Sequence, residues 1–131
     1  MALHLTQIKE TCLYVDDLAQ ARAFYADTLG LPVISEVPGR HLFLRVGPSV
    51  LLLFIPEVTE KEETLPPHFA RGKQHIAFEV PADDYAAWKE KLTALGIAIT
   101  HTQRWGTQFE SLYFDDPFGH VLEIVPAGMW G

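Results

Sequence analysis

The last predicted strand of the chain carries a carboxylate inside an apolar run. Residues 115–126 read DDPFGHVLEIVP, a turn followed by a strand, and Glu123 is flanked by Leu122 and Ile124. A lone charge is too costly to bury. Glu123 must therefore be exposed to solvent, paired with another group or bound to a metal ion, and residues elsewhere in the chain decide between these states.

An internal repeat shows where those residues lie. LYV at 13–15 matches FEV at 78–80 with an offset of 65, Leu-Gly-Leu at 29–31 matches Leu-Gly-Ile at 95–97 with an offset of 66, and LLFIP at 52–56 matches LEIVP at 122–126 with an offset of 70. Each half is predicted to form a β-α-β-β-β unit. The expected strands are 8–15, 32–36, 41–46 and 50–55 in the first half, and 73–80, 97–101, 110–114 and 120–125 in the second. Asp16 or Asp17 and then Asp83 are predicted to cap the two helices, which Gly30 and Gly96 end.

This order predicts an α+β fold made of two tandem βαβββ modules. Related by a pseudo-twofold axis, the modules would curl into an open, mixed β-barrel-like cleft with the helices outside. We expect one domain over residues 1–131, with modules at 6–56 and 73–126. A charged, proline-containing linker at 57–72 would join them, and a tail at 127–131 would follow.

Strand alternation brings three possible metal ligands to one face. Leu13 and Val15 should face the first helix, which turns Glu10 toward the cleft. In the matching strand His75 takes the position of Glu10, and Glu123 faces the cleft in the last strand. The offset of 70 makes Leu53 the repeat partner of Glu123. Three ligand side chains, with the apolar Leu53 at the fourth position, suit a catalytic metal. Substrate or water needs coordination positions that the protein leaves open.

The three residues also have an ordinary structural interpretation. Glu10 and Glu123 could lie at solvated strand ends, and His75 could be a packed core histidine. Their agreement with both the repeat and the strand alternation favours the metal site. Two carboxylates and one imidazole suit one divalent ion, Mn, Fe, Ni, Zn or Mg, without distinguishing among them.

Composition excludes several classes of function. A net charge of −7 argues against a nucleic-acid surface. The chain has no run of 18 apolar residues, so we expect no membrane span, and no signal peptide is evident. The single cysteine, Cys12, suits a reducing compartment, so we expect a cytoplasmic protein.

Three stretches carry a resemblance to a known family: ETCLYVDDLAQARAFYADTLGL at 10–31, HIAFEV at 75–80 and YFDDPFGHVLEIVP at 113–126. Over nearly all its length the chain resembles the vicinal oxygen chelate superfamily, which includes glyoxalase I, extradiol dioxygenases, fosfomycin-resistance transferases and bleomycin-binding proteins. The resemblance implies a divalent metal at Glu10, His75 and Glu123 and, for so short a chain, a homodimer. Glu10 stands where many members have His, and Leu53 where glyoxalase I has a fourth ligand. These departures argue against dioxygenase and four-ligand glyoxalase I chemistry.

The predicted function is therefore that of a metal-dependent lyase, isomerase or oxygenase acting on a small substrate chelated through vicinal oxygens. Glu10 or Glu123 could leave the metal and act as the catalytic base. The alternative is a non-catalytic protein that sequesters a ligand or drug, as bleomycin-resistance members do. Candidate substrate-binding residues share the cleft-facing alternation or lie in loops that could reach the cleft: Phe43, Arg45, His68, Arg104, Trp105 and Tyr113.

Overall fold

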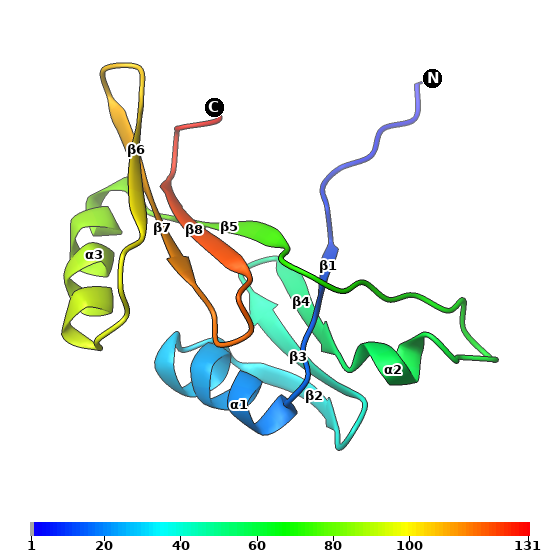
Figure 1. Cartoon of the computed structure of the whole chain (residues 1–131). Helices are drawn as coiled ribbons and strands as arrows, with labels where there is room; N and C mark the ends of the chain where they lie inside the picture. The colour runs from blue at the N-terminus through cyan, green and yellow to red at the C-terminus, as the bar shows by residue number, and fades with distance from the viewer. Residues whose placement is uncertain (1) are drawn as a thin grey trace. The chain divides into compact units, whose positions relative to one another are not determined.

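The computed structural model describes residues 2–131 and divides into two compact units. The first unit extends to Arg71, and the second comprises Gly72–Gly131. Each unit contains one four-stranded mixed sheet with helical segments (Figure 1). None of the helices within residues 2–131 is long and apolar enough to cross a membrane.

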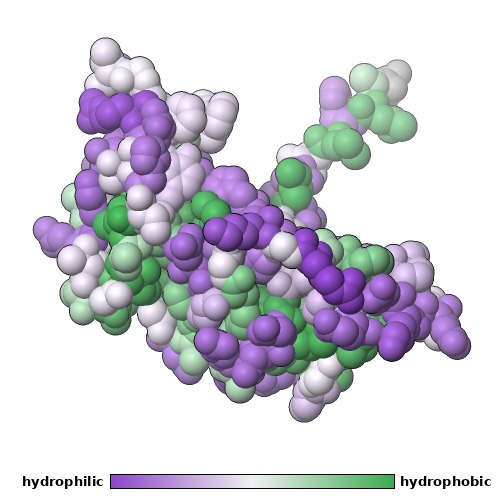
Figure 2. All heavy atoms as spheres, in the orientation of Figure 1, coloured by the Kyte–Doolittle hydropathy of each residue, from purple (hydrophilic) through white to green (hydrophobic). Residues whose placement is uncertain are grey.

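The first unit follows the predicted β-α-β-β-β order. It contains β1 (Glu10–Tyr14), α1 (Leu18–Arg22), the π-helix η1 (Ala23–Thr28), β2 (Val33–Val37), β3 (His41–Val46), β4 (Ser49–Phe54) and the short α2 (Pro56–Thr59). Its sheet has the order β1-β4-β3-β2, with β1 parallel to β4 and the other pairs antiparallel. Residues 2–9 precede β1 without helix or strand. Figure 2 shows hydrophobic and hydrophilic residues interspersed along this exposed segment.

The predicted helix at 17–29 is confirmed in extent, although its second half widens. Asp17 caps α1 by accepting a hydrogen bond from the amide of Gln20 at 2.9 Å. The chain then continues as η1, where the amide of Leu29 bonds the carbonyl of Phe24, five residues earlier. Gly30 follows with φ +83°, a conformation that ends a helix and that other residues rarely adopt.

The second unit repeats this topology. It contains β5 (His75–Val80), the 3₁₀ helix η2 (Ala82–Asp84), α3 (Tyr85–Ala94), β6 (His101–Trp105), β7 (Phe109–Asp115) and β8 (Val121–Pro126). The order β5-β8-β7-β6, with β5 parallel to β8, matches β1-β4-β3-β2 strand for strand. The α+β fold of two βαβββ modules is thus the one that the repeat predicts.

Two local predictions are wrong. The strand expected at 97–101 lies at His101–Trp105, because these residues pair with Phe109–Tyr113 of β7. Asp83 lies inside η2, and Asp84, the residue before α3, makes no side-chain capping bond. The first residues of the segment predicted as a linker at 57–72 belong to the short helix α2, and the role of this segment as a linker stays a prediction.

Each sheet buries one face under its own helix. In the first unit Leu13, Leu42, Leu44, Leu51 and Leu53 form the core with Ala21 and Tyr25 of the helix. In the second unit Leu92 of α3 is buried with Leu112, Phe114, Leu122 and Ile124. Because strand side chains alternate, the other face of each sheet presents a separate set of residues, and the candidate ligands lie on it.

Candidate active site

A histidine and a glutamate lie side by side on the second sheet, on the face away from the core. His75 begins β5, and Glu123 lies in the middle of the neighbouring β8. The Nε2 atom of His75 is 3.2 Å from Oε1 of Glu123. The histidine side chain is 50% exposed and the carboxylate only 8% exposed. The structure therefore brings together two of the three predicted metal ligands.

The other ring nitrogen of His75 fixes its tautomer. Nδ1 lies 2.8 Å from the carbonyl oxygen of Val121, which can only accept a hydrogen bond, so Nδ1 carries the proton. In a neutral imidazole, Nε2 then presents a lone pair toward the Glu123 carboxylate. Two acceptors facing each other need a proton or a cation between them. Histidines that bind metals commonly donate their second N–H to a backbone carbonyl in this way.

Tyr113 completes this part of the face. It lies opposite Glu123 on β7, and the rings of Tyr113 and His75 are 6.0 Å apart. Burial raises the pKa of the Tyr113 hydroxyl, and the nearby Glu123 carboxylate also raises it. The phenol therefore stays protonated at neutral pH. Trp105 lies on the same face, where its indole N–H donates to the hydroxyl of Ser111 at 2.9 Å.

Arg104 does not lie with these residues. It is the cross-strand partner of Glu110, whose side chain bonds Tyr85 and Lys89 of α3. Glu110 and Arg104 thus face the helix side of the sheet, whereas Trp105, one residue further, faces the His75 side. The structure separates Arg104 from Trp105 and from the His75–Glu123 pair.

In the first unit the register arranges the sheet face away from α1 in rows. Glu10 and Arg45 both lie opposite Val50, so one row carries a carboxylate and a guanidinium separated by one strand. Two strand spacings place their Cα atoms about 10 Å apart. The next row contains Cys12 and Phe43 on either side of Leu52, and the last row contains Tyr14 and His41 on either side of Phe54.

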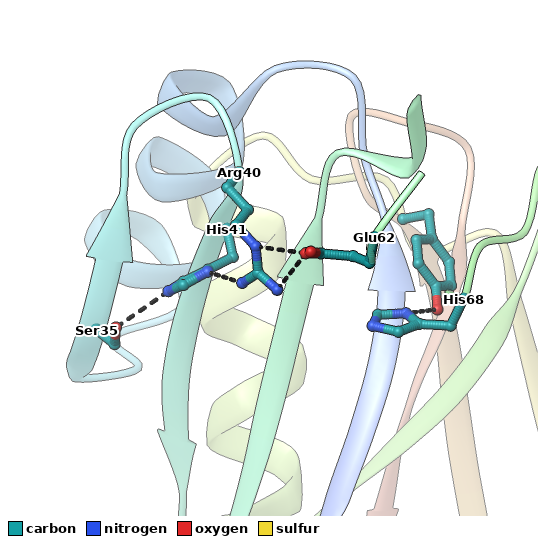
Figure 3. Close-up of polar contacts among 6 residues, drawn as sticks. Ser35, Arg40, His41, Glu62 and His68 are labelled. Atoms are coloured by element: carbon teal, nitrogen blue, oxygen red, sulfur yellow. Dashed lines mark hydrogen bonds and ion pairs between the residues drawn. The ribbon is translucent and has the colours of Figure 1, made fainter. Parts of the chain in front are cut away.

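The last two rows form an aromatic cluster consisting of Tyr14, His41, Phe43, Phe54 and His68. The rings of His41 and Phe43 stack at 3.9 Å, and the ring of His68 lies 4.7 Å from that of Phe54. His68 comes from the segment after α2, and its Nδ1 is hydrogen bonded to the Tyr14 hydroxyl at 2.7 Å (Figure 3). Phe54 and His41 are buried beneath these contacts.

A polar chain that the sequence did not reveal borders this cluster (Figure 3). Arg40 donates to Oε1 of Glu62 through Nε and Nη2, at 2.8 and 2.6 Å, and its Nη1 donates to Nδ1 of His41 at 2.6 Å. His41 therefore carries its proton on Nε2, which donates to the Ser35 hydroxyl at 3.1 Å. Burial and the Arg40 charge lower the pKa of His41. Sequence spacing gives no signal for an arginine that pairs across 22 residues.

The register also corrects the repeat partner of Glu123. Ile124 pairs with Phe78, the residue that matches Leu13, and Leu13 pairs with Leu53. Leu53 therefore corresponds to Ile124, and Leu52 corresponds to Glu123. Leu53 is fully buried in the core, whereas Leu52 lies on the opposite face between Cys12 and Phe43. The fourth position is apolar, as predicted, but Leu52 occupies it.

Glu10 belongs to the first unit, and His75 and Glu123 belong to the second. Within neither described unit do three His, Cys, Asp or Glu side chains gather closely enough to hold a metal. The role of Glu10 as the third ligand stays a prediction, as do the roles of Phe43, Arg45 and His68.

The chain thus consists of two βαβββ modules, and the second carries a His–Glu pair on the sheet face away from its core. The chain belongs to the Glyoxalase/Bleomycin resistance protein/Dioxygenase superfamily, whose family model matches residues 5–124.

Individual relatives differ in activity. A metallothiol transferase FosB of Staphylococcus epidermidis is 27% identical over 125 residues, which cover 93% of this chain and 82% of that protein. The crystal structure of a lactoylglutathione lyase from Agrobacterium tumefaciens is 35% identical, with a TM-score of 0.92 over 97% of this chain and 98% of that one. The fosfomycin resistance protein FosX of Listeria monocytogenes is 20% identical, with a TM-score of 0.66 over 97% and 95% of the two chains, a likeness of fold alone.

Proposed function

We propose that the chain is a metal-dependent enzyme of this superfamily that acts on a small substrate through two neighbouring oxygen atoms. The observation that carries the proposal is the pair formed by His75 and Glu123. A nearly buried carboxylate oxygen and an imidazole nitrogen lie 3.2 Å apart, while the second imidazole nitrogen is held by a backbone carbonyl. This arrangement fits a divalent cation, which would neutralise the carboxylate.

Glu10 is the third ligand in this proposal. Its exposed position at the start of β1 repeats that of His75 at the start of β5, since Glu10 pairs with Val50 as His75 pairs with Val121. Two carboxylates and one imidazole suit Mn, Fe, Ni, Zn or Mg. A bound divalent ion would supply Lewis-acid polarisation of the substrate's oxygens.

The chain's own residues would handle the proton and orient the substrate. Glu123 or Glu10 would accept a proton from the carbon next to a substrate carbonyl. The Tyr113 hydroxyl, opposite Glu123 in the β7–β8 pair, would help to orient the substrate next to that carboxylate. Arg45 shares its row with Glu10 and would hold an anionic group of the substrate, while Phe43 packs against its apolar part.

The ligand set narrows the reaction. It differs from the set of two histidines and one carboxylate used by non-haem iron oxygenases. With Leu52 at the fourth position, it also differs from a four-ligand site. Isomerase, lyase and transferase chemistry is favoured over oxygenation. We further propose that the two units form a single domain, and that the protein is a cytoplasmic homodimer.

The experiment is a reaction panel run with metal-loaded protein: a hemithioacetal, a catechol, and fosfomycin with a thiol. We expect turnover of the hemithioacetal or of fosfomycin, and a loss of at least about 100-fold in kcat for Glu123→Gln, within the range for a general base. Arg22→Gln, on the exposed surface of α1, is the control. Turnover of the catechol alone, or full activity of Glu123→Gln, would contradict the proposed ligand set and base.

The aromatic cluster favours ligand sequestration as the second candidate function. Tyr14, Phe43 and His68 offer ring faces and edges on which a planar ligand could stack. That function predicts saturable binding of an aromatic, cationic ligand by metal-free protein, which the net charge of −7 would assist. Binding of such a ligand without turnover of any panel substrate would favour sequestration over catalysis.

A further inference from the structure

The second unit contains a cleft on the other side of its sheet from the His75–Glu123 pair. Its volume is about 340 Å³, near the lower end of the range for small-molecule sites. Figure 1 shows the β6–β7 hairpin projecting past the first turn of α3. The cleft is lined by residues from η2 and α3, from the end of β8 and from the hairpin: Ala82, Tyr85, Arg104, Gln108, Phe109, Glu110 and Pro126.

The cleft presents one positive and one negative side chain next to each other. Arg104 and Glu110 are cross-strand partners, so their Cα atoms are about 5 Å apart. Despite this proximity the two form no ion pair in the described part of the chain. Glu110 is drawn to α3, where its Oε2 accepts from the Tyr85 hydroxyl and from Lys89, both at 2.9 Å. Arg104 turns instead to the carbonyl of Thr107, at 3.0 Å.

Both charges are held in place and keep unused hydrogen-bonding capacity. Lys89 and Tyr85 hold the pKa of Glu110 below its ordinary value, so this residue is a carboxylate at neutral pH, and its bonds to Lys89 and Tyr85 occupy only Oε2. Arg104 uses one of its five N–H groups on Thr107. The rest of the lining is the Tyr85 phenol, one amide and three apolar residues.

We propose that this cleft is a second binding site, for a small zwitterion of the α-amino-acid type with an apolar side chain. The carboxylate of the ligand would pair with Arg104, and its ammonium group would donate to the free oxygen of Glu110. Pro126 and Ala82 would contact the side chain. Neighbouring charges of opposite sign on the protein match the neighbouring charges of the ligand, whereas a ligand with a single charge would leave one of them unpaired.

This site is separate from the proposed active site, although one strand serves both. Glu110 faces the cleft, and Ser111 and Tyr113 of the same strand face His75 and Glu123. The sequence placed Arg104 and Trp105 together near the catalytic cleft, and strand alternation sends them to different sites.

The test is calorimetric titration of the full chain with L-phenylalanine and L-leucine. For phenylalanine, 3-phenylpropionate and 2-phenylethylamine are the matched analogues, each with one charge removed. We expect saturable binding of at least one amino acid, and affinities at least about tenfold lower for both single-charge analogues. Arg104→Gln should lower the affinity by a similar factor, while Arg22→Gln, with the same charge change on α1, should leave it unchanged.

His75→Ala separates this site from the proposed metal site, because amino acids can also chelate metals. Binding should survive that substitution. Glu110→Gln should weaken binding as well, but it also removes bonds to α3, so Arg104→Gln is the decisive variant. The proposal is overturned if neither amino acid binds, if an analogue binds as tightly, if Arg104→Gln binds normally, or if binding is lost in His75→Ala.

Discussion

Replacing either of two adjacent leucines by glutamate tests which of them corresponds to Glu123. Leu53 is fully buried on the α1 side of the first sheet, and Leu52 lies on the opposite face in the row of Cys12 and Phe43. In Leu53→Glu the lost leucine contacts cost about 2–5 kcal/mol, by analogy with Leu→Ala changes. Burying an unpaired carboxylate adds several kcal/mol more. The sum is comparable with the whole stability of a domain, about 5–15 kcal/mol, so we expect an unfolded protein.

Leu52→Glu should behave differently. The loss of leucine burial costs about 1.5–3 kcal/mol, and the carboxylate is desolvated less than at Leu53, because Leu52 keeps 8% of its surface exposed on the face away from α1 whereas Leu53 keeps none. We therefore expect a folded protein with a lower urea midpoint. If the glutamate at position 52 faces the same metal as Glu10, added Mn²⁺ should restore part of the lost stability. A ligand that binds only the folded state stabilises that state.

The assay is urea denaturation followed by circular dichroism, with and without Mn²⁺, on both variants and on the uncharged controls Leu52→Gln and Leu53→Gln. The controls separate the effect of the charge from the loss of the leucine side chain. A stable Leu53→Glu beside an unfolded Leu52→Glu would refute the assignment of the two faces, and with it the row that contains Glu10.

Three further outcomes follow from the contacts. The Lys89 ammonium lowers the pKa of Glu110, so the stability difference between wild type and Glu110→Gln should be present above pH 4.5 and should vanish as the pH falls through the folded-state pKa, in urea titrations. The pKa of His41 is lowered, so lowering the pH through 6.5 should reduce the free energy of unfolding of wild type but not that of His41→Gln. An equal dependence of that free energy on pH in the two proteins would contradict the burial of His41 as a neutral ring. Tyr14→Phe removes the bond to His68, costs about 0.5–1.5 kcal/mol, and should speed proteolysis within residues 60–72; unchanged cleavage would show that this bond does not anchor the segment.

Strand alternation and the repeat predict most of the fold and the pairing of two of the three candidate metal ligands. Both halves were recognisable because the Leu-Gly helix ends and the Leu-Tyr-Val and Phe-Glu-Val strands recur at nearly constant offsets. The same alternation put His75 and Glu123 on one face, where the structure has them 3.2 Å apart. Local patterns sufficed for these features because each depends on only one or two elements.

The errors arose where pairing with a distant strand decides the outcome. Matching Pro56 with Pro126 slipped the last strands by one residue, and a slip of one residue exchanges the two faces of a strand, as Leu52 and Leu53 show. Ile97 and Ile99 alternate like a strand, but β7 pairs with residues 101–105 instead. The bond from Arg40 to Glu62 and the contact of His68 with Tyr14 depend on how the segment after α2 folds back, which no local pattern encodes.

Elemental analysis of the purified, untagged protein tests the central claim most directly. It should be prepared without chelator and compared with His75→Ala, Glu123→Ala and Glu10→Ala. The account predicts near-stoichiometric divalent metal in the wild-type protein and loss of most of it in each variant, with folding verified by circular dichroism. Wild-type protein that takes up no metal even after reconstitution, or His75→Ala and Glu123→Ala proteins that retain it, would contradict the metal site and leave ligand sequestration as the better account.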